Sequence, residues 1–140
     1  MLGWGTFPRY VGHYGRDLAQ GRARNIYSAE RSDEFEQIEP EKIFAGGLEE
    51  AVAHITSRPA AVIGIVDRGL VREGYRADLV VFDPETILDT ATFSSPKQPA
   101  AGIKCVLVNG QLAVDEGEST KLRNGRTIRS RHHDGRYVVN

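Results

Sequence analysis

The stretch at residues 103–114, "IKCVLVNGQLAV", decides the fold class of this 140-residue chain. Two apolar runs flank Asn109-Gly110, and these two residues tolerate the positive φ that a type I′ hairpin turn requires. A third apolar run, "LVVF" at residues 79–82, predicts another strand, and its lack of polar alternation is typical of a strand buried on both faces. The intervening residues 83–102 include three Pro and predict a long loop. The second half of the chain therefore indicates a small antiparallel β-sheet.

The first half indicates helices. In "LEEAVAHITS", residues 48–57, apolar side chains recur at helical spacing and two Glu lie in the first turn, where the helix dipole favours them. "PAAVIG", residues 59–64, predicts a second short helix, since Pro is well tolerated in a first turn. Four Gly among the first 20 residues favour an irregular entry followed by a short helix.

These patterns predict an α+β fold in three stretches. Residues 1–66 are expected to be helical, with a mobile insertion near 21–47, because that insertion is highly charged and contains Pro40. Residues 67–129 are expected to form the β-rich part, and residues 130–140 a tail. The six Lys/Arg among the last 20 residues lack interleaved aromatics before Tyr137, so a solvated tail is favoured over a nucleic-acid surface.

Composition excludes several classes of protein. With 40% hydrophobic residues, 26% charged residues and a net charge of −1, the chain predicts neither a nucleic-acid nor an anionic-membrane partner. No apolar run approaches the roughly 20 residues that cross a bilayer, and the N-terminus does not have the order of a signal peptide. A single cysteine, Cys105, is compatible with a reducing compartment, so we expect a cytoplasmic location.

The four histidines provide no metal-ligand spacing such as His-x-His. His132 and His133, with Asp134, could bind a metal only adventitiously, and His54 lies beside an apolar helix stripe as a boundary residue would. His13 is flanked by glycines that would let a ligand approach, and a small enzyme built on His13 and the Gly-rich front is one possible hypothesis. A structural role for His13 is favoured, because one histidine without partners makes no site.

Other reactive side chains also indicate structure. Cys105 lies within a predicted strand, where burial makes a thiol inert. The carboxylates near ordered elements are Asp67, Asp78 and Asp83. Asp78 directly precedes the strand at residues 79–82, so we expect it to be partly desolvated and to accept backbone N–H groups from the turn "REGYR". The sequence therefore predicts no catalytic, cofactor-binding or metal-binding residue.

Three stretches together resemble the C-terminal part of an N-acyl-D-amino-acid deacylase, or D-aminoacylase, of the amidohydrolase superfamily. They are "GTFPRYVGHY", "LEEAVAHITSRPAAVIGIVDRGLVREGYRADLVVFDPETILDTATF" and "IKCVLVNGQLAVDEGESTKLRNGRTIR", and the similarity covers residues 3–20 and 48–129. In that family a metal-dependent barrel carries the hydrolysis and a small β-sandwich completes the fold. The resemblance implies that residues 5–57 correspond to the end of the barrel, and residues 77–82, 105–108 and 111–114 to strands of the sandwich.

The resemblance also implies that the family's zinc ligands lie upstream of Met1, so no catalytic residue is carried over. Residues 21–47 and the tripeptide 58–60 depart from the family pattern. The sequence thus predicts a C-terminal fragment of a D-aminoacylase-like amidohydrolase, without a cofactor of its own and inactive alone. The alternative is a stand-alone binding or assembly module, whose exposed strand edges pair with a second copy or with an upstream barrel segment.

Overall fold

The computed structural model describes residues 2–23, 36–37, 47–92, 94–128, 130–133 and 136–139. The chain forms two compact units, each built from two separate stretches. Unit 1 comprises Met1–Val52 with Phe82–Ile103, and unit 2 comprises Ala53–Val81 with Lys104–Asn140. The division at residues 66 and 129 that the sequence predicts stays a prediction.

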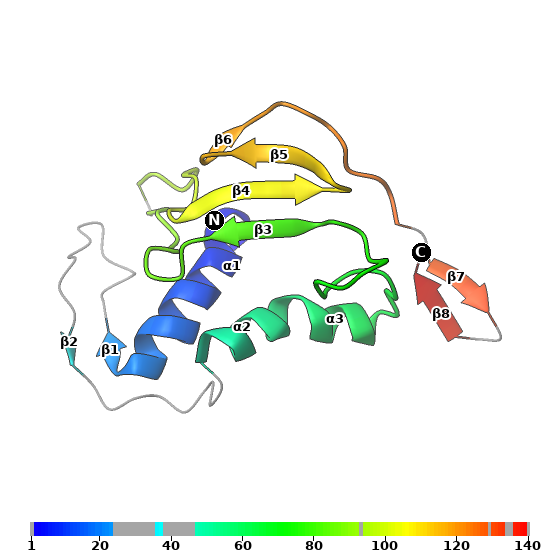
Figure 1. The fold of residues 1–140 in the computed structure, drawn as a ribbon. Helices are drawn as coiled ribbons and strands as arrows, with labels where there is room; N and C mark the ends of the chain where they lie inside the picture. Colours follow the sequence, from blue (N-terminus) through cyan, green and yellow to red (C-terminus); the bar gives the residue numbers. More distant parts are fainter. Residues whose placement is uncertain are drawn as a thin grey trace. The chain divides into compact units, whose positions relative to one another are not determined.

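The front of the chain is helical throughout its described residues 2–20, so the prediction of an irregular entry was wrong. It consists of α1 (Leu2–Arg9), the π-helix η1 (Tyr10–Asp17) and the short 3-10 helix η2 (Leu18–Gln20) (Figure 1). Two glycines explain the difference. A Cβ on Gly12 would lie 2.1 Å from the carbonyl oxygen of Ile87, and a Cβ on Gly15 would lie 2.5 Å from Cβ of Ala51. Close packing therefore overrides the poor helix propensity of Gly.

The core of unit 1 lies where these helices meet the loop at residues 83–102 and the start of α2. Its buried apolar side chains are Val11, Leu18, Ala51, Ile87 and Ala91. The described residues of the loop, 83–92 and 94–102, form no regular strand or helix, as predicted, and a bridge joins Leu88 to Ala101. Loop and helices thus share one core, although about 70 residues separate them in sequence.

The two further predicted helices are confirmed. Helix α2 spans Gly47–Ile55 and α3 spans Ser57–Val62. Between them Thr56 has φ −127° and ψ −86°, which breaks the helical path. Pro59 is the third residue of α3, where a missing N–H leaves no intrahelical hydrogen bond unmade.

The predicted sheet is confirmed as four strands in the order β3-β4-β5-β6. They are β3 (Leu79–Phe82), β4 (Ile103–Val108), β5 (Gln111–Asp115) and β6 (Glu118–Ser119) (Figure 1). Strands β4 and β5 pair antiparallel through a turn in which Asn109 has φ 49° and Gly110 has φ 79°. Both values are positive, as the Asn-Gly signal predicts. The α+β class follows from this sheet and the helices.

Strand β3 is less covered than its sequence predicts. Val80 is 52% exposed and Val81 is 48% exposed, so the expectation of burial on both faces was wrong for the described structure. Among the strands that the structure describes, β3 lies at one edge of the sheet, beside β4. Its two central valines are therefore about half exposed.

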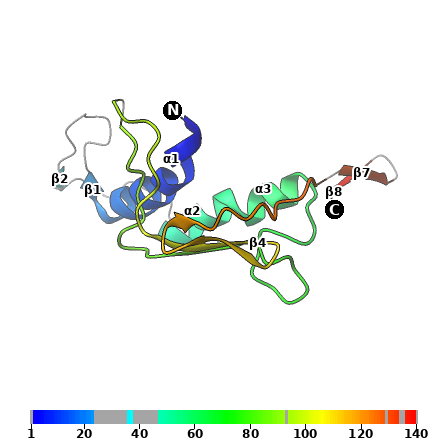
Figure 2. The same ribbon diagram turned by 90° about the horizontal axis from the view of Figure 1, so that it is seen from above.

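Short strands occur at both ends of the chain. Strand β1 (Arg22–Ala23) pairs with β2 (Glu36–Gln37), and residues 24–35 and 38–46 of the predicted insertion lie outside the described residues. Where a tail was predicted, β7 (Ser130–His133) and β8 (Arg136–Val139) form an antiparallel pair (Figure 2).

In the described part of the chain, no helix has the length and apolar character that spanning a bilayer requires. The cytoplasmic location stays a prediction.

Candidate functional site

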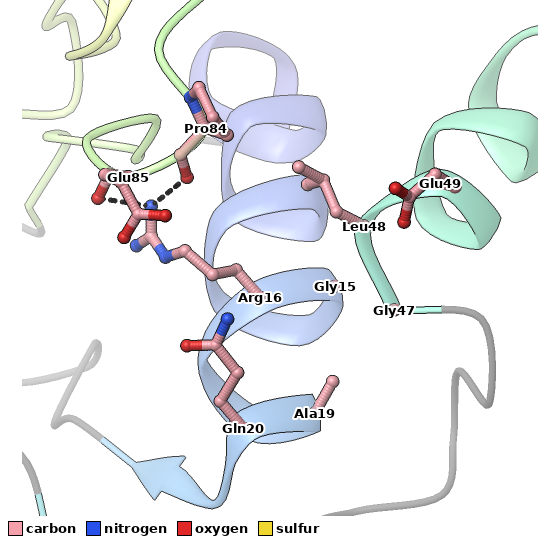
Figure 3. A pocket seen from close by; sticks show the side chains of 9 residues that line it. All are labelled: Gly15, Arg16, Ala19, Gln20, Gly47, Leu48, Glu49, Pro84 and Glu85. Carbon is pink, nitrogen blue, oxygen red and sulfur yellow. Dashed lines mark hydrogen bonds between the residues drawn. The ribbon is translucent and has the colours of Figure 1, made fainter.

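Unit 1 contains a pocket of about 330 Å³ (Figure 3). Three separate stretches line it: the end of the front helices, the start of α2 and the beginning of the loop. The lining residues are Gly15, Arg16, Ala19, Gln20, Gly47, Leu48, Glu49, Pro84 and Glu85. None of them is a Ser, Thr, Cys or His, so the lining holds no hydroxyl or thiol nucleophile and no imidazole base.

Arg16 is the cation of this pocket, and its hydrogen bonds hold the loop. It is only 4% exposed. Its Nη1 donates to the carbonyl oxygens of Pro84 at 2.9 Å, Glu85 at 2.7 Å and Ile87 at 3.3 Å. Its Nε donates to Oδ1 of Asp17 at 2.7 Å. Figure 3 shows the guanidinium directed at Pro84 and Glu85, so the charge is used to fix the loop against η1.

A second arginine also links the front helices to the loop at residues 83–102. Arg9 at the end of α1 forms an ion pair with Asp89, whose side chain is 3% exposed. Asp89 also accepts a hydrogen bond from the backbone N–H of Ala91 at 2.8 Å. Neither arginine is predicted as important by the sequence, because their partners in the loop lie 68 to 80 residues away and no local pattern signals such pairs.

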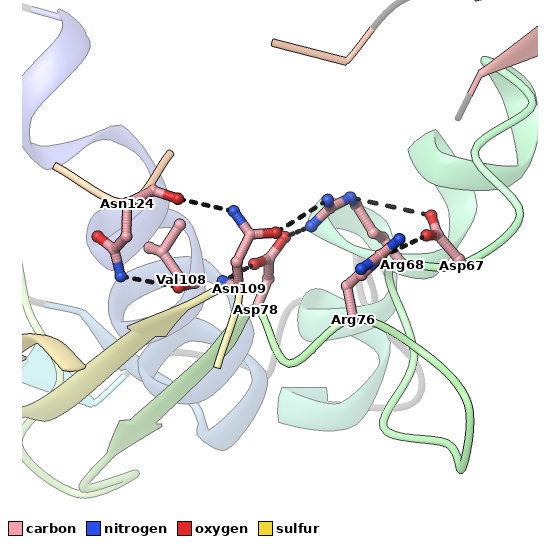
Figure 4. A network of polar contacts seen from close by, with 7 residues as sticks. All are labelled: Asp67, Arg68, Arg76, Asp78, Val108, Asn109 and Asn124. Atoms are coloured by element: carbon pink, nitrogen blue, oxygen red, sulfur yellow. Dashed lines mark hydrogen bonds and ion pairs between the residues drawn. The ribbon is translucent and has the colours of Figure 1, made fainter. Parts of the chain in front are cut away.

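A polar network organises unit 2 (Figure 4). Asp78 pairs with Arg68, and its Oδ1 accepts the backbone N–H of Asn109 at 2.7 Å. Arg68 Nη2 donates to Oδ1 of Asn109 at 3.2 Å. Asn109 Nδ2 in turn donates to the carbonyl oxygen of Asn124 at 2.8 Å. Asp78 therefore fastens the hairpin turn, and the expected bonds to the turn "REGYR" are not the ones that the structure shows for its side chain.

The other two candidate carboxylates are also held by local partners. Asp67 pairs with Nε of Arg76 at 3.1 Å and with Nε of Arg68 at 3.9 Å. Asp83 Oδ1 accepts the backbone N–H of Glu85 at 2.9 Å. The Arg68 guanidinium thus contacts both Asp67 and Asp78, and these ion pairs tie both carboxylates into the polar network of unit 2.

The candidate histidines whose side chains the structure describes, His13 and His54, each contact a neighbour on the same stretch of helix. His13 is 6% exposed within η1, and its ring lies 4.9 Å from the ring of Tyr14 in an edge-on contact. His54 lies in α2, is half-buried and contacts Arg58. His132 and His133 lie in β7, and Asp134 lies outside the described residues. Cys105, expected to be buried, is half-buried in β4.

The described residues do not fit a zinc site. Zinc in proteins takes Cys, His, Asp or Glu ligands, usually four in structural sites and three in catalytic ones. No group of three such side chains gathers within the ranges that the structure describes. We therefore assign no metal to this part of the chain.

Comparison with known proteins finds that the sequence is similar to amidohydrolases. The amidohydrolase family model matches residues 46–114. A D-aminoacylase from Alcaligenes xylosoxydans xylosoxydans is 42% identical over 125 residues, which are 89% of this chain and 21% of the relative.

Solved structures of related enzymes show the same similarity. A D-aminoacylase crystal structure, described as defining a novel subset of amidohydrolases, aligns with a TM-score of 0.68 and 39% identity over 98% of this chain and 21% of that protein. An N-acyl-D-glutamate deacylase from Bordetella bronchiseptica, in complex with zinc and a phosphonate inhibitor, aligns with a TM-score of 0.57 and 33% identity over 83% of this chain. The chain spans about a fifth of the length of these relatives.

Proposed function

Since this chain is an amidohydrolase-family sequence that corresponds to part of a D-aminoacylase, we propose that it is a structural segment of a D-aminoacylase-like enzyme. The complete enzyme would hydrolyse the amide bond of N-acyl-D-amino acids with the help of a metal ion. The segment would help to frame the catalytic barrel, and the metal ligands would come from elsewhere in the enzyme.

One observation carries this proposal: 98% of the chain aligns with a D-aminoacylase structure at 39% identity. The polar contacts agree with a framing role. Arg9, Arg16 and Arg68 each bind partners that hold a loop or a turn in place. Charged groups used in this way stabilise geometry, whereas catalytic groups must be able to exchange protons or bind a reactant.

A direct assay tests the proposed lack of activity. The purified 140-residue chain, supplied with zinc, should release no amino acid from N-acetyl-D-amino acids above the rate of a buffer blank. Elemental analysis after dialysis should find zinc well below one ion per chain. Stoichiometric zinc accompanied by turnover would contradict the proposal, because a metal-activated water is the nucleophile that this chemistry needs.

A second candidate function is a stand-alone binding or assembly module. The observation that favours it is the open sheet, in which β3 and β6 lie at the two edges. An edge strand presents unpaired N–H and C=O groups that another strand can bind. The occupant in this case would be a second copy of the chain.

Sedimentation over a hundredfold concentration range distinguishes this candidate from the first. A strand-pairing module should change from monomer to dimer, and Val81→Lys should suppress the dimer, because charge on an edge strand opposes pairing. A chain that stays monomeric at all concentrations removes this second candidate.

A further inference from the structure

Unit 2 exposes a run of aliphatic side chains between α3 and the turn that follows it. We call this run the apolar strip. It consists of Val62, Ile63, Val66, Leu70 and Val71, which are 85%, 53%, 61%, 53% and 88% exposed. Isolated exposed aliphatics are ordinary, but five within ten residues form a surface of the kind that marks an interaction site.

The charged residues inside the same stretch behave in the opposite way. The side chain of Asp67 is 28% exposed and that of Arg68 is 15% exposed, and both are directed into the polar network (Figure 4). A turn that faces water normally exposes its charges and covers its aliphatic groups. This stretch does the reverse, so its outer surface is suited to an apolar partner.

The backbone beneath the strip is held in place. The N–H of Ile65 donates to the carbonyl oxygen of Ala60 at 2.8 Å, and the N–H of Arg76 donates to that of Asp67 at 2.9 Å. Gly69, at φ +84°, approaches α3 so closely that a Cβ would lie 2.8 Å from Cβ of Ala60. The exposure of the strip is therefore built into the fold of unit 2, which favours binding because little ordering is required.

We infer that the apolar strip is a docking surface for the remaining part of a D-aminoacylase-like enzyme. The inference rests on the proposed function. The chain matches a D-aminoacylase structure over 98% of its own length but only 21% of that protein. In such an enzyme, the other four fifths of the polypeptide therefore has to pack against the part that this chain matches. The whole strip lies within residues 46–114, which the family model matches. Strand β3, half exposed at Val80 and Val81, is a second uncovered apolar element of the same unit.

A chimera provides the test. The matching segment of the Alcaligenes D-aminoacylase is replaced by this 140-residue chain, and the double variant Val62→Glu/Val71→Glu is made both in the chimera and in the isolated chain. The matched control is Leu122→Glu, because Leu122 is 57% exposed and lies outside residues 46–114.

The expected result is a contrast between the two settings. In the isolated chain the double variant should leave the thermal midpoint nearly unchanged, because both side chains already face solvent. In the chimera it should lower the thermal midpoint and reduce hydrolysis of N-acetyl-D-amino acids by roughly tenfold or more, since buried unpaired charge is costly at an interface. Leu122→Glu should have little effect in either setting.

Each other outcome overturns a defined part of the inference. If the unmutated chimera is folded and active but the double variant is equally stable and active, the proposed function stands and the docking surface is wrong. If the unmutated chimera does not fold, both are wrong. If the isolated chain sediments as a dimer that the double variant converts to monomer, the occupant is a second copy and not the rest of the enzyme.

Discussion

The two units use arginine in contrasting environments. In unit 1, Arg16 is 4% exposed and donates to three backbone carbonyls and one carboxylate. In unit 2, Arg68 and its partner Asp78 have side chains that are 15% and 35% exposed. Water partly solvates the Arg68–Asp78 pair, but it cannot reach Arg16 to replace the groups that Arg16 binds. The same residue type should therefore differ in its effect on stability, according to what remains unsatisfied when it is removed.

The largest effect is expected for Arg16→Ala. The substitution leaves Asp17, which is fully buried, without its Nε donor, and it also removes the donor to the loop carbonyls. Breaking a buried ion pair from one side costs about 3–5 kcal/mol, so we expect a loss of this size in the free energy of unfolding, measured by urea titration.

Arg16→Lys sharpens the comparison, because it keeps the charge but has one ammonium in place of the planar guanidinium fork. It should retain part of the stability and fall between the parent chain and Arg16→Ala. If Arg16→Ala costs no more than about 1 kcal/mol, a value typical of partly exposed pairs, the contrast between the two units is wrong.

The next largest effect tests the close packing of a Gly within the front helices. Gly12→Ala should gain up to about 1 kcal/mol from helix propensity but places a Cβ 2.1 Å from the carbonyl oxygen of Ile87. The clash is with backbone, which cannot rotate away, so we expect a net loss of about 1–3 kcal/mol. Thermal unfolding measures it, and Gly125→Ala, with no heavy atom within 4 Å of the new Cβ, serves as the control.

The difference between Gly12 and Asn109 shows what the sequence could and could not predict. The hairpin at Asn109-Gly110 follows from the conformations of two adjacent residues, so local reasoning predicts it. The helix around Gly12 depends on the backbone at Ile87, which is distant in sequence. A Gly that permits close packing and a Gly that breaks a helix look the same in a sequence, and only the tertiary partner distinguishes them.

The candidate site shows the same limit. The sequence predicted that Asp78 accepts backbone N–H groups; it does so, but the predicted partner was wrong. The acceptor Oδ1 binds the N–H of Asn109, 31 residues away, rather than the adjacent turn. The pocket beside Arg16 could not be predicted at all, because its lining comes from three stretches that only the fold brings together.

The smallest expected effects lie within the network of unit 2. Asp78→Ala removes the acceptor for Asn109 N–H and the partner of Arg68, and we expect a loss of about 1 kcal/mol, since water can reach the groups left behind. Asp78→Asn retains a carbonyl oxygen at the same position and should recover most of that loss. Arg76→Ala is the matched control. The Arg76 side chain is 62% exposed and pairs with Asp67 at 3.1 Å. Removing it should therefore change the free energy of unfolding by less than about 0.5 kcal/mol. Thermal melts of the three variants side by side would separate the backbone hydrogen bond from the surface ion pair. An Arg76→Ala variant as destabilised as Asp78→Ala would mean that charge, rather than the bond to the hairpin turn, dominates this network.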